Sequence, residues 1–166
     1  MSDSPIEGLS FPVAVILARR QVQHGQWTVP QWQAAGLVAG RSVPSRDSWR
    51  TLVHTGDDGE EHYLWGGLTL KIEKEHLEGY YNNLVGGQPA LFILCHEDPH
   101  GNPEPYAVTA DGEEATAGLE CDSLVYRAAI PQEIYPAMER FVVQHYVPRE
   151  PKKRKRKNWS RDDGRG

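Results

Sequence analysis

Residues 49–73 read WRTLVHTGDDGEEHYLWGGLTLKIE, and this stretch of the 166-residue chain decides the fold class. Its middle, Thr55–Gly59, is a run of glycine and aspartate that is typical of a tight turn. The preceding run, Trp49–His54, alternates in the manner of a strand and the turn leads into His62–Trp65, so the two runs predict a β-hairpin. Leu68–Ile72 then alternates apolar and polar residues, which is the pattern of a half-buried strand.

Five more runs of strand length lie outside this hairpin. They are Phe11–Val22, Trp32–Val38, Ala90–His96, Tyr106–Ala110 and Ser123–Ile130. The segments between them are polar or contain glycine and proline, so 24–30, 98–105 and 111–121 are expected to be turns or loops, and 74–84 a loop with a helical turn.

One segment, Glu133–Tyr146, has helical periodicity. Its apolar face consists of residues spaced by three or four positions: Ile134, Met138, Phe141, Val142 and His145. Pro136 falls in the first turn, where no intrahelical partner is lost, and Pro148 prevents continuation of the helix.

About seven short strands and one terminal helix predict a mainly β (α+β) fold, an antiparallel barrel or sandwich closed by the C-terminal helix. We expect residues 1–10 to be a flexible N-terminus and residues 11–148 to form a single domain with its helix at 133–146. Residues 149–166 are expected to be a disordered basic tail, because they contain too few apolar side chains to fold alone.

Charge separates the tail from the body. Residues 1–146 contain 9 Lys and Arg and 20 Asp and Glu, a net charge of −11, whereas residues 147–166 carry +6. The tail could be solubilising, hold nucleic acid, contact an anionic membrane surface or dock on an acidic protein, and docking is the favoured function. Its candidate contact residues are Lys152, Lys153, Arg154, Lys155, Arg156, Lys157 and Trp159.

The lack of a targeting signal and the small number of cysteines predict a cytoplasmic protein. The apolar run Phe11–Ala18 follows acidic residues and precedes Arg19 and Arg20, the reverse of a secretory signal, and it is too short to span a bilayer. The two cysteines, Cys95 and Cys121, are too few for a disulfide framework and are interpreted as reduced, packed thiols, although one bridge stays open.

Motifs that would name a reaction are missing from the sequence. It contains neither a phosphate-binding glycine loop with Lys-Ser/Thr nor a Gly-x-Ser-x-Gly nucleophile turn, so no catalytic residue and no cofactor are predicted. Tyr80, Tyr81 and Asn83 could line a polar ligand pocket, or form a packed corner.

Two further groups of residues have a functional and a structural interpretation. His96, Asp98 and His100 could hold a metal ion if the chain were extended, but Pro99 disturbs this extension, so a strand end that runs into a solvated loop is the favoured interpretation and no metal is predicted. Four tryptophans, at positions 27, 32, 49 and 65, are interpreted as core residues because each ring buries a large area.

A family resemblance rests on spaced aromatic, glycine and basic residues: Trp27, Trp32, Gly67-Leu68, Glu78–Leu84, Phe141-Val142, His145–Pro148 and the Lys/Arg tail. These positions, between about Pro12 and Lys157, resemble an uncharacterised bacterial family, a domain of unknown function whose genes often lie beside formate dehydrogenase genes. The resemblance implies a role in assembling, maturing or regulating this molybdenum enzyme, and supplies no catalytic residues.

Three functions follow as hypotheses. The first is a non-catalytic accessory protein that binds a formate dehydrogenase subunit or maturation factor. The second is an enzyme or binding protein for a small molecule or molybdenum-cofactor precursor at Tyr80, Tyr81 and Asn83. The third is a nucleic-acid-binding protein that uses the tail, which the acidic body disfavours. The oligomeric state is left open.

Overall fold

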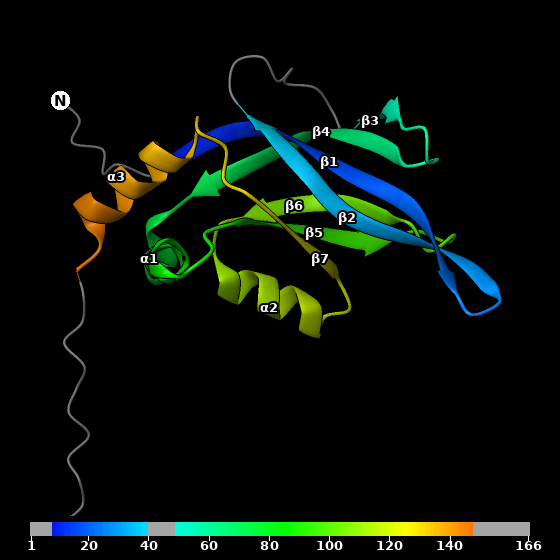
Figure 1. Cartoon of the computed structure of the whole chain (residues 1–166). Helices are drawn as coiled ribbons and strands as arrows, with labels where there is room; N and C mark the ends of the chain where they lie inside the picture. The colour runs from blue at the N-terminus through cyan, green and yellow to red at the C-terminus, as the bar shows by residue number, and fades with distance from the viewer. Residues whose placement is uncertain (1–7, 40–48, 148–166) are drawn as a thin grey trace, which may run out of the picture.

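A computed structural model describes residues 8–39 and 49–147, and Figure 1 shows them as a strongly curved sheet with two helices at one end and one helix on one face. The described strands are β1 (Leu9–His24), β2 (Trp27–Ala39), β3 (Trp49–Thr55), β4 (Glu61–Ile72), β5 (Leu91–Glu97), β6 (Pro103–Thr109) and β7 (Leu124–Ala128). The helices are α1 (Leu77–Val85), which follows a 3-10 turn η1 (Lys74–His76), α2 (Gly112–Glu120) and α3 (Tyr135–His145).

The strands form one sheet in the order β2-β1-β4-β6-β5-β7, with β3 also paired to β4. All pairs are antiparallel except β4 with β6, which meet in parallel at Leu70 and Val108. Strands β2 and β7, at the two ends of this order, contact each other, so the sheet curls into a nearly closed barrel. The predicted mainly β fold with a C-terminal helix is confirmed.

The hairpin predicted from residues 49–73 is present as β3 and β4. Thr55 pairs with Glu61, and the turn between them is closed by the amide of Gly56, which donates to the carbonyl of Glu60 over 2.7 Å. Gly59 has a φ of +83°, a left-handed conformation that glycine adopts without steric cost. The local sequence is therefore sufficient to specify this turn.

Strands β1 and β2 form a longer hairpin than the sequence predicts. The turn is only Gly25-Gln26, so the expected link at 24–30 is wrong: His24 pairs with Trp27, and Pro30 lies within β2. Proline is tolerated there because β2 is at the end of the strand order and needs hydrogen bonds along one side only. The expected loop at 98–105 is also too long, since β6 begins at Pro103.

Helix content is the main difference from prediction. The terminal helix is confirmed at Tyr135–His145, but the described residues contain three α-helices rather than one. The expected turn at 111–121 is wrong, since α2 occupies it. The buried residues of α2 are Ala115 and Gly118, and such small side chains produce no apolar periodicity in the sequence.

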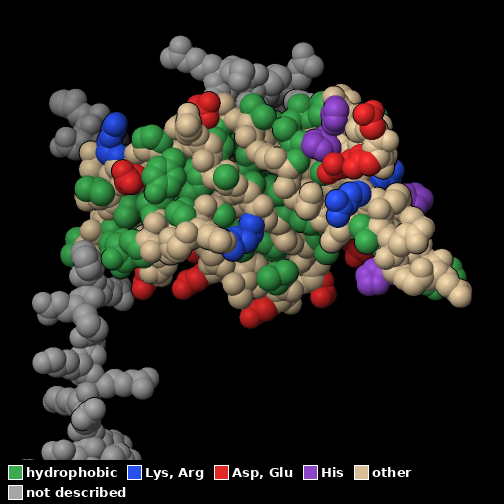
Figure 2. All heavy atoms as spheres, viewed as in Figure 1, with side chains coloured by type: hydrophobic (Ala, Val, Ile, Leu, Met, Phe, Trp, Pro, Cys, Tyr) green, Lys and Arg blue, Asp and Glu red, His purple; other side chains and the backbone are tan. Residues whose placement is uncertain are grey.

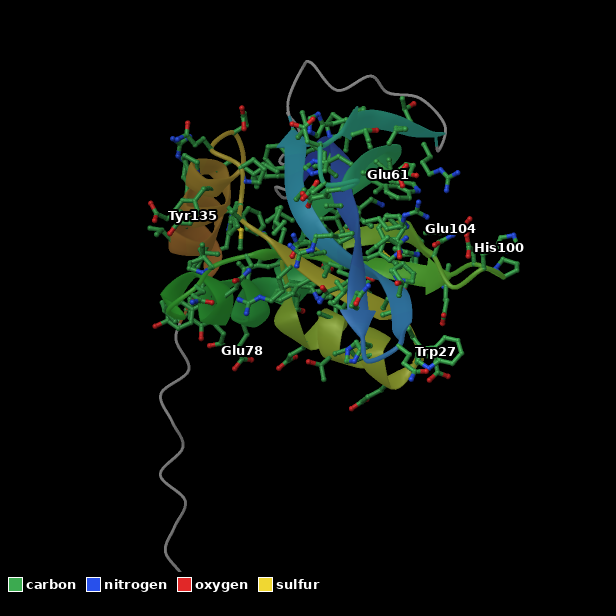
Figure 3. The ribbon with its side chains drawn as sticks, turned by 45° about the vertical axis from the view of Figure 1, so that its right-hand side comes forward. Trp27, Glu61, Glu78, His100, Glu104 and Tyr135 are labelled. Atoms are coloured by element: carbon green, nitrogen blue, oxygen red, sulfur yellow. The ribbon has the colours of Figure 1, made fainter. Side chains whose placement is uncertain are left out.

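The tryptophans differ in their environment. Trp65 is buried in the core as predicted, and Trp32 packs partly buried against it with ring centroids 6.2 Å apart. The prediction is wrong for Trp27, which is 75% exposed and lies at the tip of the β1–β2 hairpin (Figure 3). The side chain of Trp49 lies outside the described part.

The two cysteines are free, as expected, but only Cys95 is packed, since Cys121 is exposed. Burial raises the pKa of the Cys95 thiol to about 12.

The core joins the sheet to α1 and α3. It is formed by buried side chains of β1, β4 and β5 that pack against Tyr80 of α1 and Met138 and Phe141 of α3. Within the described ranges, no helix is long and apolar enough to cross a membrane. The predicted flexible residues 1–7 and the predicted disordered tail, 149–166, lie outside the described residues; Leu9 and Ser10 belong to β1.

Candidate functional site

Tyr80, a predicted pocket residue, lies on α1 with its side chain buried. Its hydroxyl accepts a hydrogen bond from the amide of Glu73 (2.9 Å) and donates to the carbonyl of Lys71 (3.4 Å). Burial, more than the nearby carboxylates, raises its pKa to about 12, so the phenol stays protonated at neutral pH. Tyr80 therefore fastens α1 to the end of β4.

Asn83, one turn further along α1, is also fully hydrogen bonded. Its amide nitrogen donates to the carbonyls of Ala90 (2.7 Å) and Ala110 (2.8 Å), and its Oδ1 accepts from the amide of Ala90 (3.0 Å). These bonds connect α1 to the beginning of β5 and the end of β6. Since both of its N–H groups are used, Asn83 holds the backbone together rather than offering donors to a ligand.

Tyr81 faces the other way, toward α3. Its ring stacks on Tyr146 with centroids 4.4 Å apart and an interplanar angle of 19°. The two rings lie beside a mainly apolar hollow of about 320 Å³ between the helices, which we call the α1–α3 groove. Its lining residues are Tyr81, Leu84, Val85, Tyr135, Glu139, Val142, Val143 and Tyr146.

The α1–α3 groove is unusually apolar for a surface. Val85 is 63% exposed and Val143 is 76% exposed, and Glu139 is the one charged residue in its lining. Figure 2 shows apolar side chains gathered at the end of the molecule where α1 and α3 lie, and Tyr135 is at the outer side of this end in Figure 3. Such a cluster is typical of a contact surface.

A larger cavity, of about 850 Å³, opens between α1 and α2; we call it the α1–α2 cleft. Arg127 lies at its wall, where the guanidinium donates to the carbonyl of Gln88 (2.8 Å) and lies 5.6 Å from the centre of the Phe92 ring. Three carboxylates, of Asp111, Glu113 and Glu120, also line it, so its charge is predominantly negative.

His76, Asp111 and Glu114 meet at the edge of α2, next to this cleft. Nδ1 of His76 is 2.8 Å from Oδ2 of Asp111 and 3.5 Å from Oε1 of Glu114. Burial lowers the pKa of His76, but the hydrogen bond with Asp111 and the charges of Glu114, Asp111 and Glu73 outweigh it, so the pKa is raised. Sequence reasoning missed this cluster because 35 positions separate His76 from Asp111.

The candidate metal ligands from the sequence, His96, Asp98 and His100, do not form a cluster of ligand atoms in the described part of the chain. Oδ1 of Asp98 accepts from the amides of His100 and Asn102, both at 2.8 Å, which closes the turn between β5 and β6 and lowers the pKa of Asp98. The ring of His96 stacks on Tyr106 at 3.9 Å. His100 is at the outer end of this turn (Figure 3).

A family model described as "Protein of unknown function (DUF3305)" matches residues 12–156. This chain belongs to that family. The predicted domain of unknown function is thereby confirmed, over nearly the range expected from the sequence. No curated protein and no solved structure matches.

The DUF3305 match extends over both candidate surfaces of the body and most of the Lys/Arg run. It includes the α1–α3 groove, the α1–α2 cleft and five of the six residues in the Lys/Arg run 152–157. The family description names no activity.

Proposed function

We propose that this DUF3305 protein is a non-catalytic accessory protein, acting in the cytoplasm, that binds an acidic partner protein. Contact is made by the α1–α3 groove together with the basic residues 152–157 and Trp159. The observation that supports this best is the exposed apolar lining of the groove, which ends only a few residues before the Lys/Arg run.

The groove provides the apolar part of the contact. Val85 and Val143 are exposed and line the groove together with the stacked Tyr81 and Tyr146, and Val147, two residues after the end of α3, is also exposed. Burying one such valine against a partner contributes on the order of 1–2 kcal/mol. Tyrosines that are already stacked lose little conformational freedom on binding, which favours affinity.

The basic run provides the electrostatic part. Lys152 follows Val147 by five residues, so the covalent chain keeps it within about 18 Å of Val147, the residue after the last one that lines the groove. Six consecutive positive charges attract an acidic surface, whereas the body, with its charge of −11, repels one. A partner with an apolar anchor beside an acidic patch satisfies both parts of the surface.

We propose that this partner is a subunit or a maturation factor of a molybdenum-dependent formate dehydrogenase. The support for this choice is the family resemblance, which implies that the genes are often neighbours.

The test is a pull-down from the native host with an N-terminal tag, quantified by mass spectrometry, followed by binding measurements with the purified partner. Val143→Glu should weaken binding at least ten-fold, because it places a charge in the groove. Glutamate has a higher helix propensity than valine, so this exposed change should not unfold α3. Leu119→Glu, at an exposed position of α2, is the matched control and should bind normally.

Replacing residues 152–157 with alanine should weaken binding most at low salt, where charges are least screened. Equal binding of V143E and the unaltered chain would overturn the role of the groove, and equal binding of the tail variant at every salt concentration would overturn that of the tail. Binding to RNA or DNA that falls steeply with salt would favour the nucleic-acid hypothesis instead.

A second candidate function is the binding of a small molecule in the α1–α2 cleft. Its volume of about 850 Å³ is in the range of ligand sites, and Phe92 and Arg127 offer an aromatic face and a cation. A molybdenum-cofactor precursor is the ligand class suggested by the resemblance. A thermal shift with pterins or nucleotides that Arg127→Ala removes would support this function, and no shift with any of them would exclude it.

A further inference from the structure

Three side chains of the types that bind metals converge where η1 meets the beginning of α2. One ligand atom from each of His76, Asp111 and Glu114 lies within 4.8 Å of the others, and no other group of three such residues does so in the described part of the chain. We propose that these residues form a binding site for a divalent transition-metal ion of the zinc type. The site is separate from the α1–α3 groove and independent of the docking function.

The donor set suits such an ion. One imidazole and two carboxylates are ligands that zinc and neighbouring divalent metals accept, and the two negative charges balance the charge of the ion. Metal binding at Nδ1 of His76 displaces the proton that now faces Asp111, and this proton leaves to solvent. His76 and Glu114 are partly exposed, so water can enter and complete the coordination.

Both carboxylates are oriented by further hydrogen bonds. Oδ1 of Asp111 accepts from the amide of Glu113 (2.9 Å), which leaves Oδ2 directed to His76. The amide of Asp111 donates to Oγ1 of Thr109 (3.1 Å), whose hydroxyl proton is then donated to Oε1 of Glu114 (2.8 Å). Outer partners of this kind hold metal ligands in position and raise metal affinity.

Gly79 of α1 leaves the space that the Asp111 side chain occupies. The Asp111 side chain is only 6% exposed, and a Cβ on Gly79 would lie 2.0 Å from its Oδ1, so only glycine allows α1 to pass this close. Gly79 and Asp111 also line the α1–α2 cleft, so a bound ion would lie beside a cavity large enough for a small molecule.

Zinc binding to the full chain, freed of metal with a chelator and followed by titration calorimetry, tests the proposal. We expect one zinc ion per chain, with affinity at least ten-fold weaker in His76→Ala and in Glu114→Gln. E114Q still accepts the Thr109 hydrogen bond, so loss of zinc binding in that variant reports the missing charge and not a disturbed fold.

Two variants serve as controls. His62→Ala removes a histidine whose Nε2 is 3.7 Å from Oε1 of Glu60, and His100→Ala removes one of the candidate ligands considered from the sequence. Both should bind zinc as the unaltered chain does. Unchanged binding in H76A and E114Q, loss of binding in H62A or H100A alone, or no saturable binding to the unaltered chain would each overturn the proposal and leave His76 as the partner of a structural ion pair.

Discussion

Gly79→Ala provides the most direct test of how α1 and α2 pack. Alanine has the higher helix propensity, so an isolated α1 would gain about 1 kcal/mol from this change. In the folded protein the new Cβ would lie 2.0 Å from Oδ1 and 2.4 Å from Cγ of Asp111, far inside the 3.4–4 Å of ordinary contact. The carboxylate or the helix therefore has to move by more than 1 Å.

The expected loss of stability in G79A follows from the hydrogen bonds that the Asp111 carboxylate makes. A displaced carboxylate loses its cap on the Glu113 amide, about 1 kcal/mol, and its charged hydrogen bond to His76, about 1.5–3 kcal/mol. After subtraction of the propensity gain, G79A should be about 2 kcal/mol less stable. For a domain of this size such a loss lowers Tm by about 5–10 °C.

Thermal and urea unfolding followed by circular dichroism measure this effect. Gly112→Ala is the matched control, because a Cβ there lies 3.9 Å from the Phe92 ring, in ordinary contact, so its stability should be unchanged or slightly higher. G79A should also cost less in an Asp111→Ala background, since the clash is then removed. If G79A is as stable as the unaltered chain, the packing described between Gly79 and Asp111 is wrong.

Further predictions concern three other features. Asn83→Ala should lower the free energy of unfolding by about 2–4 kcal/mol in urea, because it removes three hydrogen bonds and leaves their backbone groups without partners; a loss below about 0.5 kcal/mol would contradict this. The pKa of Glu61 is lowered chiefly by its hydrogen bond from Arg19. Glu61 therefore stabilises the folded protein at pH values above its pKa in the unfolded chain, and this stabilisation is lost as the pH falls through its pKa in the folded protein. Glu61→Gln should therefore be less stable by under about 1 kcal/mol at neutral pH and equal to the unaltered chain in acid; a difference that persists or grows in acid would argue against it. Ellman's reagent should label one thiol rapidly in the native protein, the exposed Cys121, and the second, Cys95, only after unfolding; rapid labelling of both, or of neither, would contradict the described burial.

Local patterns in the sequence were sufficient for several elements. The Thr55–Gly59 turn, the alternation in Leu68–Ile72 and the apolar face of the terminal helix each depend on residues within a few positions of one another. Turn conformation and one-sided burial act over such short distances, so the β3–β4 hairpin and α3 could be predicted without knowledge of the rest of the chain.

Long-range packing decided what the sequence did not show. Helix α2 buries only Ala115 and Gly118, and Gly118 is small because Leu94 of the neighbouring strand occupies the space where a side chain would be. Trp27 was expected in the core for its area, yet its position at the hairpin tip leaves it in solvent. Neither fact is encoded in local periodicity.

Of the candidate sites, the basic tail could be found from the sequence, whereas the roles of the individual side chains on α1 and η1 could not. Composition alone separated the basic tail from the acidic body, because charge adds up along the chain without reference to its path. The assignment of Tyr80 and Asn83 to backbone hydrogen bonds, of Tyr81 to the α1–α3 groove and of His76 to Asp111 and Glu114 required the tertiary structure. Asn83 and Ala110, Tyr81 and Tyr146, and His76 and Asp111 are far apart in sequence, and only the tertiary fold brings their side chains into contact. The bonds of Tyr80 to Glu73 and Lys71 span fewer than ten positions, but they form only because α1 folds back onto the end of β4.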